Sequence, residues 1–137
     1  MTKTSKTIKP WLWRIVLVVS LGVIFWLAVF QTFTGEHTKD IIQHISGMTE
    51  NHAYAMNVIV RKSAHILIYG LLGVLLYIVI RHHSITYAWL GATLIAALDE
   101  WHQSFVPDRT PLAQDVILDS LSAFLFVLLF VYIKRRR

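Results

Sequence analysis

Four long apolar segments limit what this chain can fold into. Each approaches the ~20 residues that a helix needs to cross about 30 Å of hydrocarbon. The chain is 55% hydrophobic and only 15% charged, whereas soluble domains carry about 25% charged residues. We therefore predict an all-α membrane protein, a bundle of four transmembrane helices in which the 137 residues form one domain, 1–137, with spans at about 11–31, 63–80, 85–105 and 112–133.

The first segment follows a basic stretch, as the apolar core of a signal peptide does. Its apolar run is longer than such a core, however, and no small-x-small cleavage site follows it. We expect it to be retained as a span.

Basic residues predict the orientation of the bundle. With four spans, both termini and the connection after the second span share one side, which carries no acid and holds Lys3, Lys6, Lys9, Arg14, Arg81, Lys134, Arg135, Arg136 and Arg137. The other side carries all 8 acids and the remaining bases, Lys39, Arg61, Lys62 and Arg109. Because cytoplasmic loops are enriched in Lys and Arg, we predict cytoplasmic termini in a multi-pass protein of the cell membrane.

The composition also narrows the partners. A net charge of +5 would suggest nucleic acid for a soluble protein, but here the bases flank apolar segments, so we predict the lipid bilayer as partner and no nucleic acid. The absence of cysteine excludes disulfides and thiolate chemistry. The sequence gives no indication of an oligomeric state.

The connection between the first two spans, residues 32–61, is predicted to lie outside. Within it, Ile41, Ile45 and Met48 recur at the spacing of one helical face. This pattern predicts a short amphipathic helix that lies on the outer membrane surface or covers the mouth of the bundle. A solvated loop is the alternative.

Polar residues share faces on three of the predicted spans. Arg61, His65 and Tyr69 fall within about 80° of one another at the start of the second span. Asp99 and Gln103 are about 40° apart on the third span. The fourth span begins at the predicted cap Thr110 and Pro111, and Asp115, Asp119 and Ser122 share one of its faces.

These groups are predicted to face inward. A charged side chain at mid-membrane costs about 2.5–3.5 kcal/mol even on the mildest scale, which disfavours contact with lipid. We expect Asp99, Glu100, Asp115 and Asp119 to line a polar pocket open to the outside, paired with Arg61, Lys62, Arg109 and His65. The alternatives are that single pairs act as structural clamps, that Tyr69 only packs, and that Lys62, Glu100 and His102 are interfacial.

Three stretches together resemble the VanZ family: "RKSAHILIY" (61–69), "LDEWHQSFVPDR" (98–109) and "DVILDSLSA" (115–123). The positions that carry this resemblance are Arg61, His65, Tyr69, Asp99, Glu100, Gln103, Phe105, Pro107, Arg109, Asp115 and Asp119. Ser122, Asp108 and Ile68 depart from the residues common in the family. The resemblance implies an integral membrane protein, linked in the family's named member to low-level teicoplanin resistance, and it implies no established chemical mechanism.

Three functions are compatible with these residues. In the first, the pocket binds a cell-envelope lipid, a lipid-linked cell-wall precursor or a lipoglycopeptide; Arg61, Lys62 and Arg109 hold phosphate or carboxylate, and Tyr69 and Gln103 complete the ligand-binding set. In the second, an intramembrane enzyme uses His65 as base or nucleophile, with the catalytic carboxylates Asp99, Glu100, Asp115 and Asp119. In the third, the protein is a structural or partner-binding membrane subunit.

No cofactor is predicted. A divalent metal held by His65, Asp99, Asp115 and Asp119 remains an alternative, but the chain has no His-Glu-x-x-His or comparable metal spacing.

Overall fold

The computed structural model describes residues 10–29, 35–80, 84–105 and 112–136. These residues form five helices: α1 (Pro10–Val29), α2 (Gly35–Ser46), α3 (Glu50–Val79), α4 (Ile85–Gln103) and α5 (Ala113–Arg136). The described part of the chain contains no strand, so the predicted all-α class is confirmed.

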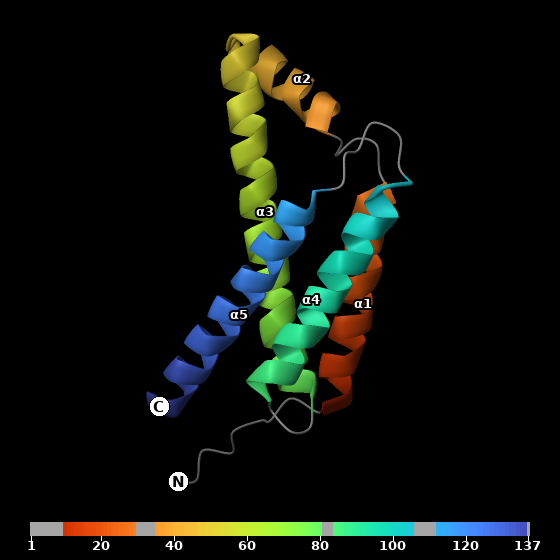
Figure 1. The fold of residues 1–137 in the computed structure, drawn as a ribbon, viewed down its shortest axis with the longest axis vertical. Coiled ribbons are helices and arrows are strands. Elements are labelled where there is room, and N and C mark those ends of the chain that lie inside the picture. Colours follow the sequence, from red (N-terminus) through yellow and green to blue (C-terminus); the bar gives the residue numbers. More distant parts are fainter. Residues whose placement is uncertain (1–9, 30–34, 81–83, 106–111, 137) are drawn as a thin grey trace, which may run out of the picture.

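Helix α3 is the centre of the arrangement and contacts all four other helices. Helices α1, α4 and α5 lie beside its lower part, and α2 packs near its upper end (Figure 1). The chain ascends through α1, descends through α3, ascends through α4 and descends through α5, so α1 begins at the same end of the bundle where α5 finishes (Figure 1). The bases of α5, Lys134, Arg135 and Arg136, therefore lie at the end of the bundle where α1 begins.

Two described helices, Glu50–Val79 and Ala113–Arg135, are long and apolar enough to cross a membrane, and Pro10–Trp26 is a shorter apolar helix. Helix α4 carries Asp99 and Glu100 within its last turns. Helix α3 begins at Glu50, well before the predicted start at residue 63. The predicted span 63–80 leaves out residues 50–62 because six of these thirteen residues, Glu50, Asn51, His52, Asn57, Arg61 and Lys62, are charged, amide or imidazole side chains, although the helix includes them.

The predicted helix of the first connection is present as α2, but it ends at Ser46. Gly47 follows with a φ of 64°, a left-handed conformation that stops a helix. Met48 therefore lies beyond the helix and does not extend its apolar face, which was predicted to include it. Ile41 and Ile45 are both exposed.

Small residues allow α3 and α5 to approach closely. A Cβ added at Gly73 would lie 3.1 Å from the backbone of Ala123, and one added at Gly70 would meet the Phe126 ring. Below this crossing, Tyr77, Ala88, Val127 and Val131 form a buried apolar cluster.

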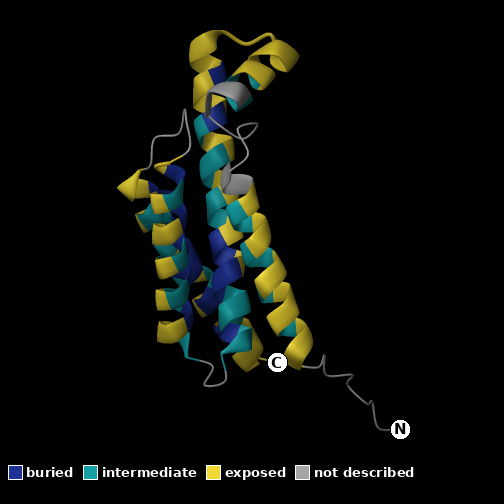
Figure 2. Cartoon of the chain, turned by 90° about the vertical axis from the view of Figure 1, so that its right-hand side faces the viewer, coloured by how far each residue is buried: buried dark blue, intermediate teal, exposed yellow. Residues whose placement is uncertain are grey.

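Figure 2 shows that the helix surfaces away from the bundle interior are exposed, and many large apolar side chains are among the exposed residues. The most exposed large apolar side chains on four helices include Val18, Leu71, Leu94 and Leu125. The buried residues, in contrast, include six charged or amide side chains: Asn57, Asp99, Glu100, Gln103, Asp115 and Asp119. Apolar outside and polar inside is the distribution that a hydrocarbon environment favours.

Candidate functional site

Nine of the ten predicted site residues come together where α3, α4 and α5 meet. Successive helical turns place four of them on one side of α3, because residues three and four apart share a helix face. The last turns of α4 and the first turns of α5 supply the others. The set is Arg61, Lys62, His65 and Tyr69 from α3, Asp99, Glu100 and Gln103 from α4, and Asp115 and Asp119 from α5.

Asp115 holds the two cations of the site. Lys62 Nζ lies 3.0 Å from Asp115 Oδ1, and Arg61 Nη2 lies 3.6 Å from Asp115 Oδ2. The Asp115 side chain is only 4% exposed, whereas those of Arg61 and Lys62 are 36% and 43% exposed. The cations therefore form a rim over a buried carboxylate.

His65 pairs with Asp119 deeper in the bundle. Its Nδ1 lies 3.0 Å from Oδ2 and 3.2 Å from Oδ1 of Asp119, which is 1% exposed. The His65 ring also stacks on Tyr69, with centroids 5.9 Å apart. A carboxylate at Nδ1 fixes the orientation of the ring and leaves Nε2 for another partner.

Asp99 receives two hydrogen bonds on one oxygen. The Tyr69 hydroxyl donates to Asp99 Oδ2 at 2.9 Å, and Gln103 Nε2 donates to the same atom at 2.8 Å. Among the described residues, the buried Oδ1 of Asp99 has no hydrogen-bond partner. Tyr69 and Gln103 thus contribute to the site by holding this carboxylate.

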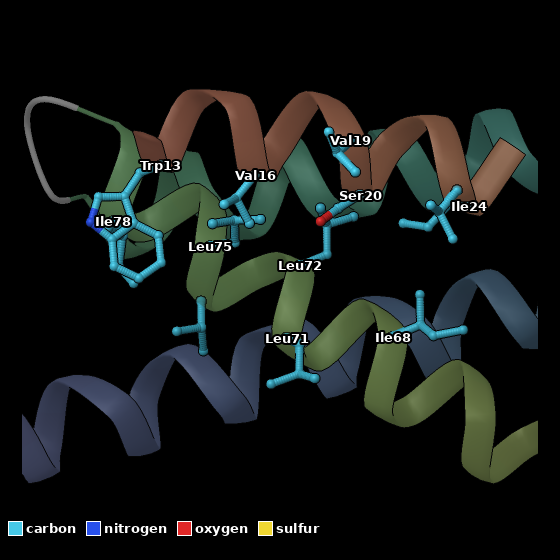
Figure 3. A pocket seen from close by; sticks show the side chains of 12 residues that line it. Trp13, Val16, Val19, Ser20, Ile24, Ile68, Leu71, Leu72, Leu75 and Ile78 are labelled. Atoms are coloured by element: carbon cyan, nitrogen blue, oxygen red, sulfur yellow. The ribbon is translucent and has the colours of Figure 1, made fainter. Parts of the chain in front are cut away.

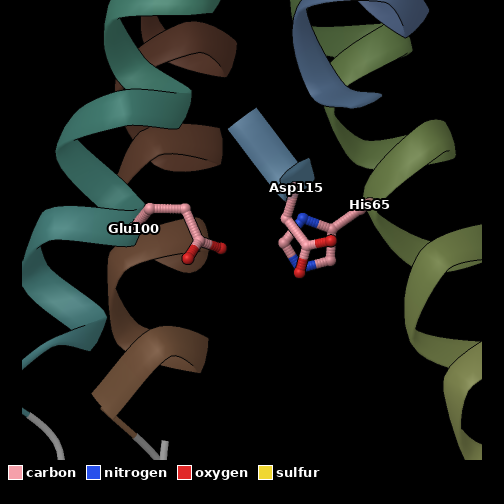
Figure 4. Close-up of side chains that lie close together, drawn as sticks. All are labelled: His65, Glu100 and Asp115. Carbon is pink, nitrogen blue, oxygen red and sulfur yellow. The ribbon is translucent and has the colours of Figure 1, made fainter. Parts of the chain in front are cut away.

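Glu100 is buried and faces α3 and α5. Its Oε2 accepts a hydrogen bond from the backbone N–H of Leu112 at 2.9 Å, and its Oε1 has no partner among the described residues. Figure 4 shows its carboxylate directed toward Asp115 and His65. One potential metal-ligand atom of each of these three residues lies within 4.8 Å of the others, so the group is suited to a divalent cation.

Some predicted residues lie apart or are not described. Arg109, Pro107, Asp108 and the predicted cap Thr110–Pro111 lie outside the described residues. His102 contacts the Phe25 ring edge-on, with centroids 6.1 Å apart. Ser122 donates to the Leu118 carbonyl of its own helix at 2.7 Å, so it serves α5 rather than the pocket.

Two polar features were missed by the sequence analysis. The Leu112 amide that binds Glu100 belongs to the backbone, which carries no side-chain signal. Ser120 joins α4 to α5 by accepting from Trp89 Nε1 at 2.9 Å and pairing with Thr93 Oγ1 at 2.8 Å. Ser120 lies about 100° around α5 from Asp119, so the polar face that contains Asp119 does not predict this second contact.

An apolar groove of about 570 Å³ lies between α1 and α3 (Figure 3). Val16, Val19 and Ile24 line it from α1, and Ile68 and Leu72 line it from α3. Of the described residues around this groove, Ser20 alone brings a hydroxyl group to the lining. Ile68 follows Arg61 by two helical turns on the same side of α3, or about 10 Å along the helix axis.

Apolar outer faces around a buried meeting point of carboxylates, imidazole and bases indicate a helical membrane protein with a polar site buried between its helices. The chain belongs to the VanZ/LLP1 family, whose family model matches residues 11–134. No curated protein and no solved structure matches it significantly. Family membership confirms the resemblance inferred from the three sequence stretches.

Proposed function

We propose that this protein binds an anionic amphiphile at the outer side of the cell membrane, with the headgroup at Arg61 and Lys62. The candidates are a phosphate-bearing envelope lipid, a lipid-linked cell-wall precursor or a lipoglycopeptide. The last of these would connect the site to the glycopeptide resistance implied by the resemblance to VanZ.

The observation that carries this proposal is the distribution of charge with exposure. Arg61 and Lys62 are partly exposed, while the carboxylate that positions them is buried. A guanidinium beside an ammonium provides a bidentate donor and a second positive charge for one phosphate or carboxylate. Asp115 satisfies these cations before the ligand arrives and holds them in place.

The apolar groove supports an amphiphile rather than a free anion. It follows α3 below Arg61 and is lined almost entirely by aliphatic and aromatic side chains, so a tail can occupy it while the headgroup stays at the rim. An acyl or prenyl chain gains about 0.8 kcal/mol for each CH₂ it buries.

The proposal includes four spans with cytoplasmic termini. It is supported by the antiparallel order of α1, α3, α4 and α5 and by the bases at the end of the bundle where α5 finishes. A helix needs about 20 residues to cross the hydrocarbon, so, counting back from Val79, we assign Arg61 and Lys62 to the outer interface. Glu50 and the residues after it, together with α2, then lie outside.

Native mass spectrometry of the detergent-solubilised protein tests the headgroup site. The probes are a polyprenyl phosphate, phosphatidylglycerol and, as the uncharged control, diacylglycerol. Arg61→Gln and Lys62→Gln should each weaken binding of the two phosphate-bearing probes about tenfold, the effect of one charge-assisted hydrogen bond. Arg135→Gln and Lys134→Gln, at the opposite end of the bundle, are the matched controls. Equal binding by all four variants would contradict the headgroup assignment.

A second pair of variants tests the tail site. Ser20→Phe places an aromatic ring in the groove, whereas Val18→Phe places it on an exposed face of the same helix. We expect the first variant to reduce binding of the polyprenyl phosphate and the second to leave it unchanged. If both bind equally, the tail does not lie in this groove.

An intramembrane enzyme is the second candidate, favoured by the His65–Asp119 contact of 3.0 Å. With Asp119 at Nδ1, His65 Nε2 can remove a proton from a water molecule that attacks the phosphorus of a bound lipid phosphate. The bond between phosphorus and the lipid oxygen breaks, and the imidazolium returns the proton to that oxygen, giving the lipid alcohol and inorganic phosphate. Release of phosphate from a polyprenyl phosphate by the purified protein, abolished in His65→Gln, would establish this activity. No release above the His65→Gln background would restrict the site to binding.

A further inference from the structure

We propose that His65, Glu100 and Asp115 form a binding site for one divalent transition-metal ion, with Mn²⁺ and Zn²⁺ preferred over Mg²⁺ and Ca²⁺. This inference goes beyond the proposed function and does not require it, because the metal ligands are an imidazole and two carboxylates rather than the cations of the rim.

The three side chains come from three helices and converge on one point. One donor atom of each lies within 4.8 Å of the others (Figure 4). Ligand atoms about 2.1 Å from a tetrahedral zinc ion are about 3.4 Å apart, so small side-chain rotations are enough to close the site around an ion.

Glu100 gives an independent reason to expect a ligand. The residue is 6% exposed, and its Oε1 has no partner in the described structure. A buried carboxylate oxygen without a donor is destabilising, because it has lost its water without replacing it. Since the side chain points toward His65 and Asp115, a cation placed among the three would satisfy this oxygen.

His65 is already oriented for metal binding. Metal-binding histidines commonly donate their second ring N–H to a carboxylate, which fixes the tautomer and the direction of the ring. Asp119 lies 3.0 Å from Nδ1, so Nε2 is the nitrogen left for the metal. Asp119 is therefore a positioning residue in this scheme and not a ligand.

The donor set selects the class of metal. Mg²⁺ and Ca²⁺ prefer oxygen ligands alone, whereas an imidazole suits Zn²⁺ and tolerates Mn²⁺ together with carboxylates. Three protein ligands leave at least one coordination position for water or for an oxygen of a phosphate.

Lys62 provides the sharpest test, because it competes with the metal for Asp115. Its ammonium lies 3.0 Å from Asp115 Oδ1, and its partly exposed side chain has room to move away. Removing this charge should tighten metal binding by about fivefold, the effect of one partly exposed ion pair. The same change weakens a phosphate headgroup under the proposed function, so the two ideas predict opposite signs for Lys62→Gln.

The experiment is a Mn²⁺ titration of the full-length, chelator-treated protein in detergent, followed by electron paramagnetic resonance, with Zn²⁺ as competitor. We expect one site in the micromolar range, tightened by Lys62→Gln. Glu100→Gln and Asp115→Asn should each weaken it at least tenfold. Asp99→Asn is the matched control, because Asp99 is an equally buried carboxylate that is held by Tyr69 and Gln103. It should change the affinity by less than threefold.

Electron spin-echo modulation identifies the nitrogen ligand directly. Modulation from a histidine nitrogen should be present in the wild type and in His102→Ala, and absent in His65→Ala. The inference would be overturned if no Mn²⁺ binds, if Glu100→Gln leaves the affinity unchanged, or if the bound ion shows no histidine modulation.

Lipid binding measured in the presence of chelator tests the proposed function separately. A variant that elutes as aggregate is replaced by Glu100→Asp, which keeps the charge and should weaken the metal by shortening its ligand.

Discussion

Helices α3 and α5 meet through two different kinds of contact. In the lower half, Gly70 and Gly73 admit Phe126 and Ala123, so the helices meet through small residues and an aromatic ring. In the upper half, the same two helices are joined by Lys62 to Asp115 and by His65 to Asp119. One pair of helices thus uses steric fit at one end and charge pairing at the other.

The lower half shows that this chain can join its helices without charges. Small residues allow close approach, which is the common means of helix association in membranes. Charged pairs are a less economical solution, because each charge must first leave water and is stabilised only when its partner is well placed. The charged upper half is therefore better explained by a function than by a need to hold α3 against α5.

The largest expected effect separates these explanations. His65→Leu leaves the Asp119 carboxylate, 1% exposed, without its partner and should destabilise the protein by about 3 kcal/mol. The double variant His65→Leu/Asp119→Leu removes both charges and should recover most of this loss. The free energy of unfolding of the single and the double variant is measured by SDS titration in mixed micelles. A double variant as unstable as the single one would show that the pair is needed to hold the bundle.

The second effect tests the steric half. Gly73→Ala places a methyl group 3.1 Å from the Ala123 backbone and should destabilise by about 2 kcal/mol through overpacking. Gly22→Ala, which meets nothing within 4 Å, is the matched control and should be neutral or slightly stabilising. Equal unfolding midpoints for the two variants would mean that α3 and α5 do not depend on close approach.

The upper half was easier to predict from the sequence than the lower half. Polar residues three and four apart within apolar segments identify one face of each helix, and the cost of exposing charge to lipid indicates that the faces point inward. The residue pattern alone therefore predicts that His65, Asp99 and Asp119 lie together. The lower contacts depend on Gly73 and Ala123 meeting across helices, and small residues occur along all the spans without a pattern that selects this pair.

Individual partners within the site were also beyond the sequence. Helix angles assign a residue to a face, but rotations of neighbouring helices decide which carboxylate each base meets. For Lys62 and Glu100, an interfacial position was the alternative. Lys62 instead pairs with Asp115, and Glu100 is buried. The predicted span 63–80 covers only part of α3, because hydropathy marks the most apolar part of a helix and not its more polar first turns.

The third prediction concerns Tyr69, at the boundary between the two halves. Tyr69→Phe removes one donor to Asp99, while Gln103 continues to donate to the same oxygen. We therefore expect the free energy of unfolding to fall by about 1.5 kcal/mol. Tyr87→Phe, at an exposed position on α4, is the control. If Tyr69 also holds ligand, the variant should bind polyprenyl phosphate more weakly at temperatures where it is fully folded. Unchanged binding would assign Tyr69 to the scaffold.

The smallest effect comes from the hydrogen bonds that join α4 to α5 through Ser120. Ser120 receives Trp89 and pairs with Thr93, away from the bases and carboxylates of the site. Hydrogen bonds between membrane helices contribute about 0.6 kcal/mol each, so Ser120→Ala should lower stability by about 1 kcal/mol. Ser122→Ala is the control and should change the stability less, because the Ser122 hydroxyl bonds to the Leu118 carbonyl of its own helix.

Both variants should bind polyprenyl phosphate and Mn²⁺ like the wild type, because a polar group in the scaffold half serves assembly alone. A tenfold loss of either ligand in Ser120→Ala would show that function extends below Asp119, and the division between a scaffold half and a binding half would then not hold.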